Sequence, residues 1–113
     1  MDILKLTTTQ RTFAALKDGM IKDYAREIRP NTMAKYCELD EEGYCKDVDG
    51  ILQPRKYDVI KFTCGHESVA FRIDKAQIEL FEDENKELIT YTEGGEEYIA
   101  AQVVYFLGAQ IDV

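Results

Sequence analysis

The fold is decided by residues 19–30, which read Gly-Met-Ile-Lys-Asp-Tyr-Ala-Arg-Glu-Ile-Arg-Pro. Three basic side chains and a glutamate fall within this short segment, between a glycine typical of a helix end and a proline. Pro30 disfavours the helical conformation at Arg29, so residues 21–29 are expected to form an extended strand. The segment therefore predicts a strongly charged strand close to the start of the chain.

Side chains alternate between the two faces of such a strand. Glu27 and Arg29 then share one face, while Lys22, Tyr24 and Arg26 share the other. Neither face is uniformly apolar. Two interpretations remain open: a bulge within residues 23–26 that turns Glu27 and Arg29 into a cleft, or a solvent-exposed edge strand.

A helix is predicted before the charged segment, over residues 10–18. Thr8 or Thr9 offers the hydroxyl of an N-cap, and Phe13 and Leu16 recur at helical spacing. Gly19 stands where a helix favours a left-handed residue at its end. A short strand is expected at residues 3–6, ahead of this helix.

After Pro30, a second short helix is expected through residue 36 or 37. Residues 38–55 then lose periodicity, and five acidic residues and two glycines fall within residues 39–50. This composition indicates an irregular surface loop, for which a lid and a disordered segment are both open possibilities.

The second half of the chain is strand-rich. Gly65-His66 and Gly94-Gly95 are expected turns, the latter in a hairpin. Gly108 is expected to interrupt the last strand. The predicted fold is α+β: a small, mostly antiparallel β-barrel with one or two helices near the N-terminus, forming a single domain over residues 1–113. The expected strands cover residues 57–64, 68–73, 77–81, 88–92, 97–99 and 102–107.

Composition limits the classes of partner. The net charge is −8, from 22 acidic and 14 basic residues, which argues against non-specific binding of duplex nucleic acid. A local basic cleft on an acidic body would still suit a compact ligand with few phosphates. No apolar run is long enough for a membrane-spanning helix, so no membrane partner is expected. Three cysteines do not form a closed disulfide framework, and a reducing cytoplasm is the expected location.

Cysteine and histidine also define the candidate metal ligands. Three cysteines with one histidine are a legitimate zinc set, but no Cys-x-x-Cys pair is present to form half a site. We therefore predict no metal and no cofactor, and expect His66 to be a turn residue. The candidate ligands are Cys37, Cys45, Cys64 and His66.

With these residues in place, the chain resembles the ASCH family of the PUA-like superfamily. The family has a helix ending at Gly, followed by Gly-x-Lys-x-x-Glu-x-Arg leading into a strand. Here the matching residues are Gly19, Lys22, Glu27 and Arg29, with one extra residue between Gly and Lys and two between Lys and Glu. The apolar run 103–107, which leads into Gly108, is similar to the last strand of the family.

The resemblance implies a β-barrel whose cleft binds a nucleotide-like small molecule or RNA. We expect this chain to be an RNA- or nucleotide-binding module. Its binding residues would be Lys22, Tyr24, Arg26, Glu27 and Arg29. From the residues alone, the same charges also fit a solvated strand with weak surface ion pairs.

Two other functions stay open. Some ASCH members resemble amidohydrolases acting on modified cytidine, which would make Lys22 the catalytic residue. Ala25 stands where those enzymes place Thr, and Glu67 or Glu79 would have to supply their Glu. The other possibility is a protein-interaction module that binds no nucleic acid.

Overall fold

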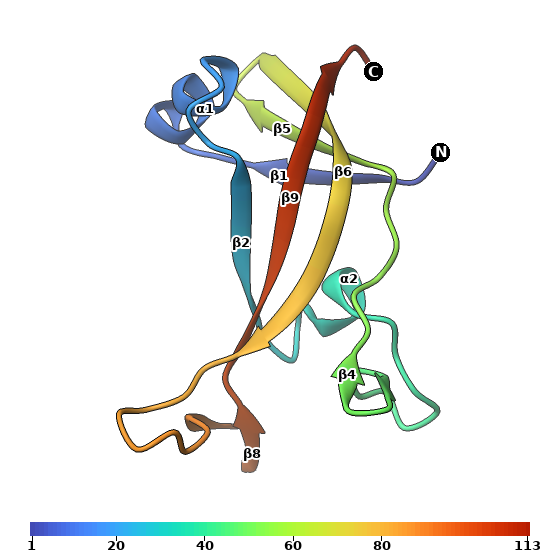
Figure 1. Cartoon of the computed structure of the whole chain (residues 1–113), viewed down its shortest axis with the longest axis vertical. Coiled ribbons are helices and arrows are strands. Elements are labelled where there is room, and N and C mark those ends of the chain that lie inside the picture. Colours follow the sequence, from blue (N-terminus) through green and yellow to red (C-terminus); the bar gives the residue numbers. More distant parts are fainter. The chain divides into compact units, whose positions relative to one another are not determined.

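The computed structural model describes all 113 residues and is mostly β, with two helices in the first third of the chain (Figure 1). This confirms the predicted combination of a strand-rich body with one or two helices near the N-terminus. The helices are α1 (Gln10–Lys17) and α2 (Met33–Tyr36). The strands are β1 (Ile3–Thr7), β2 (Asp23–Ile28), β3 (Asp47–Val48), β4 (Ile51–Leu52), β5 (Val59–Cys64), β6 (Glu67–Leu80), β7 (Thr90–Glu93), β8 (Glu96–Ile99) and β9 (Ala101–Ile111).

The strands form one larger sheet and two hairpins. The five-stranded sheet has the order β1-β5-β6-β9-β2, and β3-β4 and β7-β8 are separate two-stranded sheets. Strand β1 is parallel to β5, whereas β5 and β6 are antiparallel and joined by the predicted Gly65-His66 turn. Both hairpins are antiparallel as well.

The chain divides into two compact units. The first unit comprises Met1–Tyr24, Lys56–Ala76 and Tyr105–Val113, and the second comprises Ala25–Arg55 and Gln77–Val104. Strands β2, β6 and β9 contribute residues to both. No helix has the length and apolar character needed to cross a membrane.

Helix α1 confirms the prediction in detail. The hydroxyl of Thr9 accepts a hydrogen bond from the backbone N–H of Thr12, as an N-cap does. At the other end Gly19 has φ +71°, a conformation that glycine adopts without a Cβ penalty. Phe13 and Leu16 are the buried face of the helix, which lies against β5 in the first unit (Figure 1).

The core of the first unit is built around Phe62 of β5. Its side chain is fully buried, and its ring makes edge-to-face contacts with Tyr24 and Phe71, at centroid distances of 4.8 and 6.3 Å. The β5–β6 register places Phe62 opposite Val69, which is also buried. Burial of large apolar side chains at this point supplies the main driving force for folding of the unit.

The predicted break at Gly108 is wrong. Strand β9 continues through Gly108 to Ile111, and β6 is likewise one continuous strand where two were expected. A Cβ at position 108 would collide with the carboxylate of Asp74 on β6. Glycine is therefore explained here by a close approach of a neighbouring side chain, and no turn is required.

Residues 38–55 contain defined backbone structure. The β3-β4 hairpin lies within this range, and isolated bridges join Leu39 to Cys45 and Cys37 to Pro54. Asp49 and Gly50 both have positive φ at the hairpin turn, and the Asp47 carboxylate accepts a hydrogen bond from the Gly50 N–H at 2.7 Å. Two of the acidic residues in this part of the chain, Asp47 and Asp49, therefore belong to a hairpin.

Candidate functional site: a tyrosine-lined pocket in the second unit

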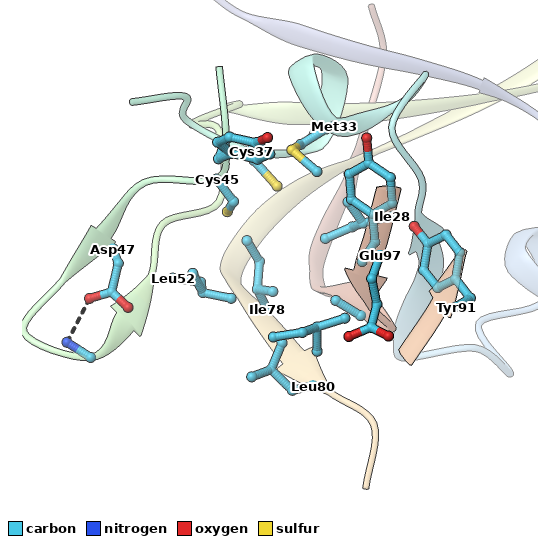
Figure 2. A pocket seen from close by; sticks show the side chains of 15 residues that line it. Ile28, Met33, Cys37, Cys45, Asp47, Leu52, Ile78, Leu80, Tyr91 and Glu97 are labelled. Carbon is cyan, nitrogen blue, oxygen red and sulfur yellow. Dashed lines mark hydrogen bonds between the residues drawn. The ribbon is translucent and has the colours of Figure 1, made fainter. Parts of the chain in front are cut away.

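The second unit contains a pocket of about 390 Å³, within the size range of small-molecule sites (Figure 2). Its wall is largely apolar, and it is formed by the segments around α2, the β3-β4 hairpin, the end of β6 and the β7-β8 hairpin. The main apolar contributors are Ile28, Met33, Leu52, Ile78, Leu80 and Ala101.

Tyr91 and Tyr98 form an aromatic wall of this pocket. They stand opposite each other in the β7-β8 register, and their rings stack at a centroid distance of 5.7 Å with an interplanar angle of 25°. The register follows from the predicted turn, since Gly94 and Gly95 have φ +61° and +82° and close a two-residue hairpin. The position of the two glycines in the sequence thus determines that the two tyrosine rings lie side by side.

Arg29 contacts one member of this aromatic pair. Its guanidinium lies over the ring of Tyr91, 4.4 Å from the centroid, and forms an ion pair of 2.9 Å with Glu27. The Arg29 N–H also donates to the hydroxyl of Thr32 at 2.9 Å, which fixes the turn that leads into α2. The ring of Tyr91 therefore contacts a cation that is itself held in place.

Two carboxylates border the pocket from opposite sides, as Figure 2 shows for Asp47 and Glu97. One oxygen of Asp47 is used in the hairpin turn. Glu97 is on β8 and exposed, so its carboxylate is an acceptor for a ligand donor. Nearby, the hydroxyl of Tyr98 donates to Glu96 at 2.9 Å, and this hydrogen bond raises the pKa of Tyr98 above its ordinary value.

Cys37 and Cys45 form the sulfur-lined part of the wall. Cys37 is only 2% exposed, and its burial strongly raises the pKa of its thiol. Burial also raises the pKa of Cys45, while a hydrogen bond from Cys37 opposes this increase. No group of three or more His, Cys, Asp or Glu side chains gathers where it could hold a metal ion, and Cys64 and His66 belong to the first unit.

The residues predicted from the charged segment are distributed between the two units. Lys22 is exposed in the first unit, where its backbone carbonyl accepts from the Leu107 N–H at 2.9 Å. Tyr24 is half-buried against Phe62. Arg26, half-buried on β2, belongs to the second unit with Glu27 and Arg29.

Of these five residues, the structure brings Glu27 and Arg29 into an ion pair, and none of the five lines the pocket. Sequence reasoning missed Tyr91, Tyr98 and Glu97. The Gly94-Gly95 turn was the available signal, because a two-residue hairpin centred there necessarily pairs position 91 with position 98.

Charge is distributed very unevenly over the chain. The second unit has 15 acidic and 6 basic residues, a net charge of −9, whereas the first has 7 acidic and 8 basic residues, a net charge of +1. The pocket therefore lies in the acidic unit. This field disfavours ligands with several phosphates and favours neutral or cationic ones.

No known protein family matches the chain, and neither the curated proteins nor the solved structures give a match.

Proposed function

We propose that this chain is a binding module for a nucleoside-like molecule, whose base enters the pocket of the second unit. The observation that carries this proposal is the stacked Tyr91–Tyr98 pair in the wall of a mostly apolar pocket of about 390 Å³. Stacking of a base on an aromatic side chain contributes about 1–3 kcal/mol. Glu97 adds an acceptor suited to an exocyclic amino group.

The ligand class follows from charge. In a unit of net charge −9, a nucleoside or a nucleotide with few phosphates is favoured over an RNA strand, whose binding depends on phosphate neutralisation. The resemblance of residues 19–29 to the ASCH family is compatible with this proposal. As part of the same proposal, we infer that the fold is a closed PUA-like barrel and that the nucleotide-like partner is intracellular. Arg29 would act from outside the pocket, by holding Tyr91.

No observation favours the amidohydrolase alternative over binding. Lys22 is exposed and does not line the pocket, and Ala25 offers no hydroxyl beside it. A calorimetric titration with nucleosides distinguishes the protein-interaction alternative from nucleoside binding, because the protein-interaction alternative predicts no saturable nucleoside binding.

Calorimetric titration of the whole chain with cytidine, adenosine and uridine tests the proposal. We expect saturable binding of cytidine and adenosine, and about tenfold weaker binding of uridine, which lacks the amino group. Glu97→Gln is expected to reduce cytidine affinity about tenfold. The matched control is Glu93→Gln, which makes the same charge change on the same hairpin at a residue that does not line the pocket.

Tyr98→Leu provides the second variant, and it is expected to weaken every nucleoside by a similar factor because stacking is insensitive to base identity. If no nucleoside binds saturably, or if both pocket variants bind as the unaltered chain does, the proposal is wrong. Salt-sensitive binding of single-stranded RNA that Glu97→Gln leaves unchanged would instead select the RNA alternative.

A further inference from the structure

Two thiols line the same wall of the pocket. Cys37 ends α2, where its N–H donates to the Met33 carbonyl at 2.8 Å, and its side chain is almost fully buried. Cys45 lies in the segment between α2 and β3 and is half-buried. Both side chains line the pocket, and the Cys45 thiol donates to the Gln53 carbonyl at 3.9 Å. Figure 2 shows Cys37 and Cys45 at the same end of the pocket.

The backbone holds these thiols in place. Three hydrogen bonds connect the segments that carry them in a closed ring: Glu38 N–H to Gln53, Gln53 N–H to Lys46 and Lys46 N–H to Glu38, at 3.0, 2.9 and 2.8 Å. The Leu39–Cys45 bridge adds a further tie. Each cysteine directly neighbours a residue of this ring, so the frame holds both side chains at the same end of the pocket.

We propose that Cys37 and Cys45 form a reversible intrachain disulfide in the pocket wall, by exchange with a small disulfide such as oxidised glutathione. This inference depends on the two thiols and their frame, and not on the ligand of the pocket. A disulfide requires a sulfur–sulfur distance of about 2.05 Å. The segments that carry the two thiols are already joined next to them, because the Lys46 N–H donates to the Glu38 carbonyl at 2.8 Å.

The exchange has two steps. The Cys45 thiol loses its proton to solvent, and the thiolate attacks one sulfur of oxidised glutathione, which releases one glutathione thiolate and leaves a mixed disulfide on Cys45. Cys37 then attacks the Cys45 sulfur, and the Cys37 proton passes to the departing glutathione sulfur, so that the second glutathione leaves as a thiol. Two cysteine thiols are oxidised and one glutathione disulfide is reduced to two thiols.

The structure also assigns the order of attack. Cys45 is half-buried, whereas Cys37 is only 2% exposed, so Cys45 is the thiol that a small disulfide in solution reaches first. Cys37, which is almost fully buried, acts as the resolving thiol. The disulfide would join the end of α2 to the segment that precedes β3, and it would close the sulfur-lined end of the pocket with a covalent bond.

The test treats the reduced, folded chain with excess oxidised glutathione and follows intact mass and disulfide mapping. We expect a mass loss of two hydrogens, a disulfide that joins Cys37 to Cys45, and Cys64 still available to iodoacetamide. Cys37→Ser should retain a glutathionyl group on Cys45. Cys45→Ser should leave Cys37 unmodified.

A reaction in urea supplies the control. The unfolded chain should give a mixture of pairings that includes Cys64, whereas the folded chain should give the Cys37–Cys45 bond alone. Formation of this bond in urea but not in the folded Cys64→Ser variant would overturn the proposal, because the native frame would then oppose the bond. Native pairing of Cys64 with either other cysteine would overturn it equally.

Discussion

The guanidinium of Arg29 lies 4.4 Å from the centroid of the Tyr91 ring, so a residue that follows β2 is tied to the β7-β8 hairpin within the second unit. Glu27 holds the same guanidinium through an ion pair of 2.9 Å. The contact gives the charged segment a local structural role: it positions one ring of the aromatic wall.

Arg29→Ala is therefore expected to reduce the free energy of unfolding by about 1 kcal/mol, through loss of a cation–π contact and a partly exposed ion pair. Glu27→Gln removes the ion pair alone and should reduce it by less than about 0.5 kcal/mol. Urea titration monitored by tyrosine fluorescence measures both. Equal losses for the two variants would mean that the contact with Tyr91 contributes nothing.

The core of the first unit allows a stronger test. Phe62 is 0% exposed between Tyr24 and Phe71, and Phe62→Ala should lower the free energy of unfolding by about 3–5 kcal/mol. Phe81 is 37% exposed, and Phe81→Ala should lower it by roughly 1 kcal/mol. Urea unfolding of the two variants distinguishes them; similar losses would contradict the assigned core.

Local signals in the sequence predicted the local structure well. The Thr9 cap, the left-handed Gly19 and the Gly94-Gly95 turn each have a direct stereochemical cause, and each is present where it was expected. Gly108 misled the prediction because the reason for glycine there is a side chain on another strand. Residue type alone does not reveal which strand lies alongside.

The candidate site was harder to predict, for the same reason. Charge density drew attention to residues 22–29, whereas the pocket gathers Tyr91, Tyr98 and Cys37 from segments far apart in the chain. The pairing of the two tyrosines was accessible from the turn, but their proximity to the two thiols depends on tertiary packing. No spacing rule expresses that proximity.

Gly108 and Asp74 should be energetically coupled, because a Cβ at position 108 would meet the Asp74 carboxylate. Gly108→Ala alone is expected to destabilise the chain by about 1 kcal/mol as Asp74 is displaced. In the Asp74→Ala background the same change should be neutral or slightly stabilising, since alanine loses less backbone entropy than glycine in a strand. A double-mutant cycle in urea measures the coupling, and simple additivity of the two changes would contradict the close approach.

Cys37 makes the reduced protein sensitive to alkaline pH. Burial raises the pKa of its thiol far above the ordinary value of 9.0, so the unfolded chain releases this proton at a lower pH than the folded chain. The stability that the neutral thiol provides is complete below pH 9.0 and declines as pH rises above it, by about 1.4 kcal/mol per pH unit. Urea unfolding of the reduced chain and of Cys37→Ala between pH 7 and pH 10.5 tests this pH dependence.

The Cys37→Ala variant should be less stable at pH 7, because the substitution leaves a cavity. The difference in the free energy of unfolding should shrink above pH 9, as the original chain loses the stability that its neutral thiol provides. Curves that stay parallel to pH 10.5 would show that the Cys37 thiol ionises as readily in the folded chain as in the unfolded one.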